Sequence, residues 1–346
     1  MDAADGYRTD IGYTYSYHSE LNPLRLRLAF LNAGLPVPAV TAACELGFGQ
    51  GVSLAIHAAA SAARWHGTDI NPAHAGFAQS LATASGAEVG IHGDSFVDFS
   101  GRDLPMFDYI GLHGVWSWIS DGNRAAIVAF IKRRLKPGGV LYMGYNALPG
   151  WAAFSPLRHL LVEHANRTGG EGTPIAERID EAIRFSDRLL AANPGFARDN
   201  PGIVDSFKAL REDDRHYLAH EFFNRDWQPM HFATVARWLV LSDVGYACSA
   251  DYADHIDAMG LSGAQRSLLA DVGDIGLRET VKDLIVNPRF RRDYWVKGTE
   301  RLSTTDRAEA LRRERVIAVA RPLELPLKLQ AALALSHPGP GEAAYG

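Results

Sequence analysis

The chain has 346 residues, of which 47% are hydrophobic and 22% are charged, and its formal net charge is −5. This length and composition are typical of a globular protein with one large elaborated domain or two modest ones. The acidic balance, with a pI near 6.2, gives no reason to expect a nucleic-acid partner, because phosphate binding needs a concentrated basic surface. A local basic patch stays an alternative, for example around Arg289, Arg291 and Arg292.

Two cysteines, Cys44 and Cys248, lie far apart in the sequence and are too few for a disulfide framework or a zinc site. Both lie in apolar runs, so we expect two small buried side chains and no metal. The polar start of the chain lacks the basic and apolar regions of a signal peptide, and no apolar run approaches the ~20 residues that span a bilayer. These features predict a cytoplasmic protein without a membrane span.

The chain opens with aromatic residues at alternate positions. Of these, Tyr15 and Tyr17, with the following His18, are candidates for a lid that folds over a ligand, although simple packing on the domain is an equal alternative. The pair Asn22-Pro23 then predicts a helix start, with Asn22 as the cap, and Gly34 predicts the end of that helix.

Short apolar runs alternate with amphipathic stretches through the next hundred residues. The strand candidates are 40–46, 64–69, 88–92, 107–113 and 139–145. The helix candidates are 52–62, 72–84 and 123–135. Alternation at this spacing predicts an α/β fold in which a parallel, doubly wound sheet carries helices on both faces.

After residue 151 the pattern becomes mainly helical, and strand candidates return only at 246–252 and 293–297. We therefore expect a seven-stranded, doubly wound, Rossmann-like sheet with a helical insertion and a C-terminal helical extension. The expected segments are an N-terminal lid and helix at 1–38, a ligand-binding core at 39–151, the insertion at 152–230, the end of the sheet at 231–298 and the extension at 299–346. The Pro- and Gly-rich tail from residue 337 is expected to be disordered.

The strongest local signal is the run Glu45-Leu46-Gly47-Phe48-Gly49-Gln50-Gly51, in which an apolar strand leads into three glycines and a helix pattern follows. Small residues there let the backbone approach a ligand and leave the first helix N–H groups open. The G-x-G-x-G spacing departs from the dinucleotide pattern G-x-G-x-x-G. Glu45 favours S-adenosylmethionine, which has no pyrophosphate but carries an ammonium group. A dinucleotide, or a glycine-rich turn without ligand, stays an alternative.

Two further acids follow the next two predicted strands. Asp69 is placed to accept hydrogen bonds from both hydroxyls of a ribose, and Asp94 to accept one from an adenine amino group, with Phe96 packed on the ring. Each acid alone also fits a turn or a helix cap. Together with the glycine loop they predict one nucleoside-sized cleft at which Glu45, Asp69 and Asp94 converge.

At this point the sequence resembles class I methyltransferases that carry a methyltransferase regulatory domain, a group that includes bacterial protein-lysine methyltransferases of the rickettsial type. The resemblance covers residues 13–298, and members often continue longer at the C-terminus. Its glycine loop is shared by all class I methyltransferases, whereas His-Gly-x-x-Ser-Trp and Tyr-Asn-x-x-Pro-Gly-Trp are more specific. The segments that carry it are 45–51, 113–119, 145–151, 217–222 and 289–293.

Methyl transfer requires a site that aligns nucleophile, methyl and sulfur, excludes water and leaves the nucleophile a free lone pair. His113 ends the fourth predicted strand and is a candidate for taking a proton or orienting the nucleophile, unless it only fixes the loop. Tyr145 and Asn146 end the fifth strand and are candidates for the acceptor entrance. Trp116 is a candidate wall of the cofactor cavity, with Trp118 as the alternative.

Three functions stay open: methylation of protein lysine, methylation of a small molecule or glycan precursor, and a non-catalytic S-adenosylmethionine-binding module. The partner is accordingly a protein or small-molecule methyl acceptor, and apolar helices of the insertion suit a homodimer. The predicted cofactor-binding residues are Glu45, Gly47, Phe48, Gly49, Gly51, Asp69, Ile70, Asp94, Ser95, His113 and Trp116.

Overall fold

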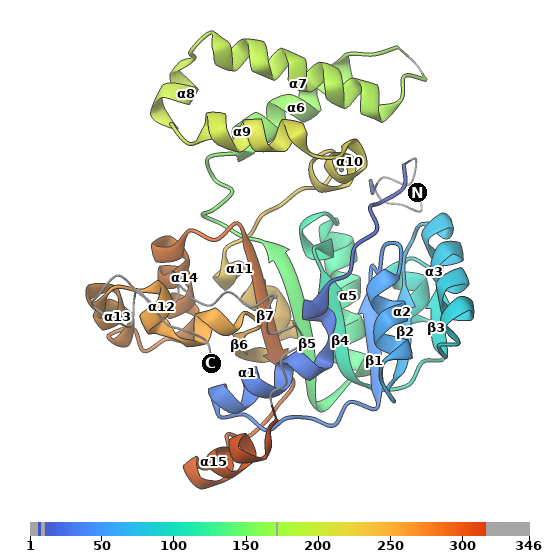
Figure 1. Ribbon diagram of the computed structural model, residues 1–346, viewed down its shortest axis with the longest axis vertical. Helices are drawn as coiled ribbons and strands as arrows, with labels where there is room; N and C mark the ends of the chain where they lie inside the picture. Colours follow the sequence, from blue (N-terminus) through green and yellow to red (C-terminus); the bar gives the residue numbers. More distant parts are fainter. Residues whose placement is uncertain (1–5, 8–10, 171, 316–346) are drawn as a thin grey trace, which may run out of the picture.

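A computed structural model describes residues 6–7, 11–170 and 172–315 of the chain. Seven strands form one sheet in the order β3-β2-β1-β4-β5-β7-β6 (Figure 1). Only β7 runs antiparallel to its neighbours β5 and β6. The strands are β1 Ala42–Leu46, β2 Arg64–Thr68, β3 Val89–His92, β4 Phe107–His113, β5 Leu135–Asn146, β6 Gly245–Ser249 and β7 Phe290–Val296. The predicted seven-stranded, doubly wound sheet is confirmed.

Helices cover both faces of this sheet because successive strand residues point to opposite sides. Short helices α1 and α2, with α3, cover the face on which Tyr109 and Tyr142 are buried. Helices α4, α5 and α11 cover the face that buries Ile110 and Met143. The bounds are α1 Leu26–Ala33, α2 Val52–Ala59, α3 Pro72–Ser85, α4 Phe96–Ser100, α5 Asp121–Arg134 and α11 Phe232–Leu239.

Local signals in the sequence fix several of these helix ends. The side chain of Asn71 accepts a hydrogen bond from the Ala73 N–H at the start of α3, and Pro72 occupies the first turn. Gly86 ends the same helix at φ 67°, a conformation that glycine adopts without strain. Asn22 likewise caps a short 3₁₀ turn, η2 (Pro23–Arg25), that leads into α1, so the predicted helix begins as a tighter turn.

The predicted helical insertion forms a separate layer with its own hydrophobic core. In Figure 1 it lies beyond the end at which β5 finishes. Its helices are α6 Ser155–Arg167, α7 Ile175–Ala191, α8 Gly195–Asp199, α9 Ile203–Glu212 and α10 Arg215–Phe222. The connection from β6 to β7 is also helical, with α12 Asp257–Gly260, α13 Gly263–Ala270 and α14 Ile275–Val286.

The C-terminal extension begins with α15, Thr304–Arg313. It packs on α1 through an ion pair in which Arg27 Nη2 lies 2.5 Å from Glu314 Oε1. The tail predicted to be disordered lies outside the described residues. Within the described residues, no helix is long and apolar enough to cross a bilayer. The same residues contain no cluster of side chains able to hold a metal ion, and both cysteines are buried thiols.

Candidate cofactor and acceptor site

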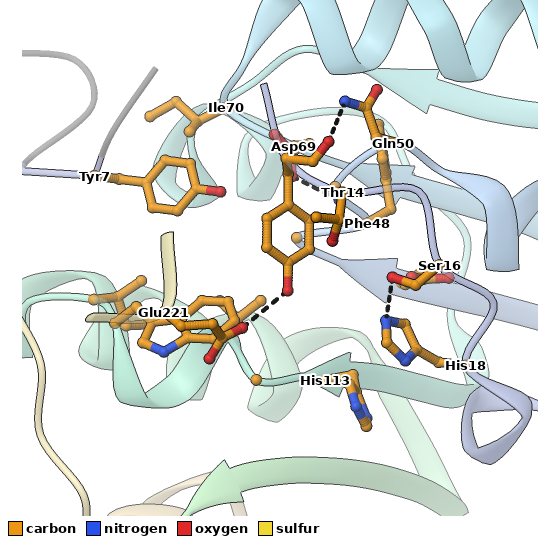
Figure 2. A pocket seen from close by; sticks show the side chains of 18 of the residues that line it. Tyr7, Thr14, Ser16, His18, Phe48, Gln50, Asp69, Ile70, His113 and Glu221 are labelled. Carbon is orange, nitrogen blue, oxygen red and sulfur yellow. Dashed lines mark hydrogen bonds between the residues drawn. The ribbon is translucent and has the colours of Figure 1, made fainter. Parts of the chain in front are cut away.

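A cavity of about 500 Å³ lies where the carboxyl ends of the parallel strands β1 to β5 meet the helical insertion and the N-terminal segment (Figure 2). The three acids Glu45, Asp69 and Asp94 all line it. The other predicted residues on its wall are Gly47, Phe48, Gly49, Ile70, His113 and Asn146. The expected convergence of the glycine loop and the three carboxylates on one cleft therefore exists in the fold.

The glycine loop needs glycine for two physical reasons. Gly47, Gly49 and Gly51 have φ values of +70°, +56° and +71°, in the left-handed region that other residues rarely adopt. A Cβ on Gly47 would also lie 2.4 Å from Val115 Cγ2, and one on Gly51 would lie 2.5 Å from the Ala78 side chain. Gly51 therefore packs α2 against α3 and does not line the cavity, which corrects its predicted contact with the cofactor.

Glu45 is a buried carboxylate that forms no ion pair with any residue the structure describes. Its side chain lines the cavity with 3% of its surface exposed, and Oε2 has no hydrogen-bond partner. Burial, together with the nearby charge of Asp69, raises the pKa of Glu45 to about 8. An ammonium group placed in the cavity would supply the missing partner, since buried charges are stable only when they are paired.

Asp69 holds the glycine loop in place. Its Oδ2 accepts a hydrogen bond from the Gly49 N–H at 2.9 Å, and its Oδ1 accepts one from the Asn71 N–H at 3.0 Å. His74 Nδ1 lies 3.2 Å from the same Oδ1. Each carboxylate oxygen has further lone-pair capacity, so Asp69 still offers an acceptor to a hydroxyl group.

Asp94 is held by an arginine outside the cavity. Arg102 donates from Nε and Nη2 to the two carboxylate oxygens at 2.6 and 2.8 Å, and this pairing lowers the pKa of Asp94. Phe96 lines the cavity beside it, as expected. Ser95 does not line the cavity. It caps α4, because its Oγ accepts from the Asp98 N–H at 3.1 Å, so its predicted cofactor contact is wrong.

The two tryptophans after β4 have exchanged the predicted roles. Trp116 is fully buried in the sheet core and packs edge-on against Trp238 at 6.0 Å, so the prediction that it walls the cavity is wrong. Trp118 lines the cavity instead. The reason is the 3₁₀ turn η3, Val115–Ser117, whose three-residue periodicity sends positions 116 and 118 in different directions.

His113 is a neutral imidazole at the wall of the cavity. Its ring stacks on His18 at 4.3 Å, and Nδ1 lies 2.8 Å from the Tyr142 hydroxyl. Burial lowers the pKa of His113 well below the usual value, and the charge of Arg292 adds to that shift. A neutral ring at this place is able to accept a hydrogen bond or to orient a polar group.

Asn146 and Tyr145 point to different places although they are neighbours. Asn146 lines the cavity, and its N–H donates to Ser117 Oγ at 2.8 Å. Tyr145 is fully buried in the core, and its hydroxyl donates to Asp293 Oδ2 at 2.8 Å. The predicted acceptor-entrance role of Tyr145 is therefore wrong, because strand alternation turns its side chain away from the cavity.

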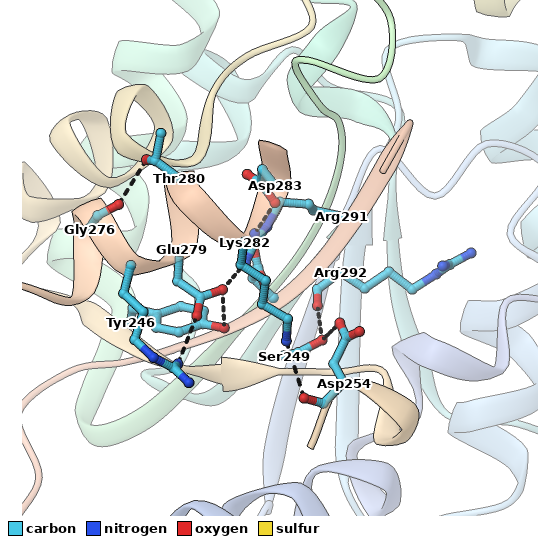
Figure 3. A network of polar contacts seen from close by, with 12 residues as sticks. Tyr246, Ser249, Asp254, Gly276, Glu279, Thr280, Lys282, Asp283, Arg291 and Arg292 are labelled. Carbon is cyan, nitrogen blue, oxygen red and sulfur yellow. Dashed lines mark hydrogen bonds and ion pairs between the residues drawn. The ribbon is translucent and has the colours of Figure 1, made fainter. Parts of the chain in front are cut away.

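Through Asp293, Tyr145 joins a buried polar network centred on Arg291. Figure 3 shows Arg291 with two of its acids, Glu279 and Asp283. Arg291 pairs with Glu279 at 2.9 Å, with Asp283 at 2.5 Å and with Asp293 at 2.9 Å. These contacts join β7 to α14. The strand β7 begins at Phe290 and not at the predicted residue 293. It includes the charged and buried Arg291 because the surrounding acids neutralise that side chain.

The three arginines considered as a basic patch lie in three different environments. Arg291 is buried in its network, Arg289 is exposed and donates to Ser206 Oγ at 2.6 Å, and Arg292 lines the cavity. No continuous basic patch results from them. Arg292 is instead a cation at the cavity wall, with Nε 3.5 Å from Glu20 Oε1.

The roof of the cavity comes from the N-terminal segment and the helical insertion, through residues that sequence reasoning did not single out. Tyr13 of the N-terminal segment donates from its hydroxyl to Glu221 Oε1 of α10 at 2.9 Å, and Gln50 Nε2 donates to the Tyr13 carbonyl at 2.9 Å. The predicted lid residues Tyr15 and Tyr17 are 68% and 47% exposed and do not line the cavity. The aromatic alternation did indicate a covering segment, but it did not show which tyrosine points inward.

Comparison with known proteins assigns the family. Residues 43–139 match the methyltransferase domain family, and residues 214–297 match a predicted methyltransferase regulatory domain. The chain is 37% identical over 331 residues to the Synechocystis protein sll1526, covering 94% of this chain and 65% of that protein. It is 26% identical over 293 residues to RP789 of Rickettsia prowazekii, covering 82% and 51%.

Solved structures share the fold. PKMT2 from Rickettsia typhi superposes with a TM-score of 0.70 at 22% identity, covering 85% of this chain and 57% of that one. The same protein in complex with AdoHcy gives a TM-score of 0.71 at 20% identity, covering 92% and 62%. The chain thus spans less than two thirds of the length of these relatives.

The sheet order, the glycine loop at its carboxyl edge and the family match at residues 43–139 define a class I methyltransferase. With the second match at residues 214–297, the chain combines a methyltransferase domain with a predicted methyltransferase regulatory domain.

Proposed function

We propose that the protein transfers the methyl group of S-adenosylmethionine to an amine, with a protein lysine as the favoured acceptor. The observation that carries the cofactor assignment is the buried, unpaired carboxylate of Glu45 beside the glycine loop. S-adenosylmethionine brings an ammonium group to that end of the cavity and a ribose and an adenine to the ends marked by Asp69 and Asp94.

When bound, the cofactor supplies a methyl group already activated on a sulfonium. The residues of the chain exclude water and orient the acceptor around it. The aromatic faces of Tyr13 and Trp118 tolerate positive charge at the cavity wall through cation–π contact, which contributes ~0.5–2 kcal/mol. The neutral ring of His113 and the amide of Asn146 offer hydrogen-bonding groups to the acceptor without adding charge.

An amine acceptor must lose its proton before it can attack. A lysine ammonium has an unperturbed pKa near 10.4 in water. Loss of water on entry into the cavity disfavours the charged form and lowers that pKa, whereas a neighbouring carboxylate or aromatic face favours the charged form while the acceptor binds. The sequence resemblance to rickettsial protein-lysine methyltransferases, together with the fold shared with PKMT2 of Rickettsia typhi, supports a protein lysine. The roof formed by α10 and the N-terminal segment covers the cavity, which also suits a small amine as the second candidate.

Two measurements test this proposal on the full chain. Isothermal titration with AdoHcy is expected to show 1:1 binding, and absence of binding would refute the cofactor assignment. Methyl-labelled S-adenosylmethionine is then incubated with poly-L-lysine and, separately, with a cell lysate divided into protein and small-molecule fractions. Label recovered as methyl-lysine supports the proposal, label confined to small molecules supports the second candidate, and label in neither excludes both.

A further inference from the structure

The carboxylate of Glu221 lies in the roof of the cavity. The residue belongs to α10, within the part of the chain that matches the regulatory domain. Figure 2 shows it across the cavity from Asp69 and Gln50. Oε1 accepts the hydrogen bond from the Tyr13 hydroxyl at 2.9 Å. Within the described residues Oε2 has no hydrogen bond, and neither oxygen has an ion-pair partner.

Aromatic side chains line the same cavity as this acid. They are Tyr13, Tyr217, Trp118, Trp151 and Phe222. Contacts between these rings hold them in position. Trp151 packs edge-on against Phe222 with ring centroids 5.6 Å apart, and Tyr13 packs edge-on against Trp118 with centroids 6.3 Å apart. Aromatic faces around a carboxylate attract ammonium and methylated ammonium groups, whose positive charge lies close to the rings.

Two carboxylates of the cavity, Glu45 and Glu221, have no ion-pair partner among the described residues, and one cofactor ammonium cannot pair with both. S-adenosylmethionine carries one ammonium, which the floor residue Glu45 suits. The sulfonium is a cation but has no N–H to donate. The ribose hydroxyls and the adenine amino group are assigned to Asp69 and Asp94. Glu221, on the opposite wall, therefore keeps a carboxylate oxygen with no donor from the described residues and none assigned to it from the cofactor. Burial raises the pKa of Glu221 to about 8, so a cation that enters would also recover the cost of ionising it.

We propose that Glu221 binds the ammonium of the acceptor, within an aromatic cage made by Tyr13, Tyr217, Trp118 and Trp151. The acceptor class is then a cationic alkylamine, and its methylated forms keep the charge that the cage attracts. Glu221 acts as the group that selects and positions the acceptor. This inference rests on the proposed function and adds to it the residue that recognises the substrate.

Its test uses the full chain saturated with AdoHcy, so that no sulfonium is present. Two probes are titrated calorimetrically: N-acetyl-trimethyllysine amide and its uncharged isostere, in which a tert-butyl group replaces the trimethylammonium. The wild type is expected to bind the cation at least tenfold more tightly than the isostere. Glu221→Gln is expected to lose that preference, while its Kd for AdoHcy changes less than twofold.

Controls separate the possible outcomes. Glu212→Gln removes an exposed carboxylate of the same helical insertion and is expected to retain the wild-type preference. Tyr13→Phe frees Glu221 from its hydroxyl donor and is expected to keep the cation preference. With poly-L-lysine as acceptor, Glu221→Gln is expected to raise KM more than it lowers kcat.

Equal binding of the two probes by the wild type, or a full preference retained in Glu221→Gln, overturns the inference and leaves the proposed function intact. Loss of AdoHcy binding in Glu221→Gln overturns it as well, because Glu221 would then serve the cofactor. Absence of AdoHcy binding by the wild type defeats the proposed function, and the inference fails with it.

Discussion

Two groups of acids in this protein differ in one respect. Around Arg291, three carboxylates from β7 and α14 surround a cation that the chain itself provides. In the cavity, Glu45 and Glu221 have no cation from the described residues. Even beside its arginine, Asp283 has a pKa raised by burial to about 6, whereas the pKa of Glu45 reaches about 8.

The difference separates a structural role from a binding role. A buried carboxylate is costly unless it is paired, so a fold that pairs its acids internally has used them for its own stability. Acids left unpaired at a cavity wall instead favour the binding of a cation, because its charge neutralises theirs. The comparison therefore predicts that the Arg291 network controls folding, while Glu45 and Glu221 control binding.

The largest expected effect comes from removing the internal cation. Arg291→Met leaves three acids buried without a partner and is expected to lower the free energy of unfolding by about 3–5 kcal/mol. Urea unfolding measures it. Arg289→Met, at an exposed position just before the same strand, is the matched control and is expected to cost less than 1 kcal/mol. A loss below 1 kcal/mol for Arg291→Met would show that the network is not structural.

The unpaired acid of the cavity predicts a pH dependence of stability. The pKa of Glu45 is raised in the folded state to about 8, so the folded protein binds more protons than the unfolded chain between the ordinary carboxyl pKa and pH 8. Stability from this group is therefore present at low pH and lost as pH rises through that window. Without ligand, wild type is expected to lose ~3 kcal/mol relative to Glu45→Gln between pH 5 and 8. Parallel pH profiles would contradict this, and exposed Glu88→Gln should follow the wild type.

The glycine loop predicts a pure binding defect. Gly49→Arg places a long side chain from the loop into the cavity and is expected to weaken AdoHcy more than 100-fold, or about 2.7 kcal/mol. Calorimetric titration measures the loss, and circular dichroism checks the fold. Gly260→Arg adds the same charge where a side chain meets open space, and should bind AdoHcy as the wild type does. Binding by Gly49→Arg within threefold of the wild type would remove the loop from the site.

The smallest effect tests the corrected position of Tyr145. Tyr145→Phe removes one donor to Asp293, which keeps its bonds from Arg291, so a loss of about 1–2 kcal/mol in stability is expected. Neither kcat nor KM for poly-L-lysine should change by more than twofold. A tenfold fall in kcat would show that Tyr145 takes part in the reaction.

The sheet was predictable because its signals are local. Apolar runs alternate with amphipathic stretches, Asn71 and Gly86 mark the ends of α3, and Gly47 to Gly51 mark the turn that the cofactor needs. The start of β7 was not predictable from one sequence. An arginine is usually exposed, and only the folded structure shows that acids neutralise Arg291 inside the strand.

The site was predictable on its floor and not on its roof. Glu45 and Asp69 stand next to the glycine loop or one strand away, so parallel strand order alone brings them together. Tyr13 and Glu221 are 208 residues apart in the sequence, and only the packing of α10 over the sheet joins them. Trp116 and Trp118 were exchanged because a single 3₁₀ turn decides which one faces the cavity.

The most direct measurement of the central claim is the number of protons released when AdoHcy binds at pH 7, obtained by calorimetry in buffers of different ionisation enthalpy. Glu45 is mostly protonated before binding and becomes ionised against the ligand's ammonium, so the wild type is expected to release close to one proton. Glu45→Gln is expected to release none and to bind about tenfold more weakly. Tight AdoHcy binding by both proteins with the same proton count would contradict the assignment of Glu45 as the partner of that ammonium.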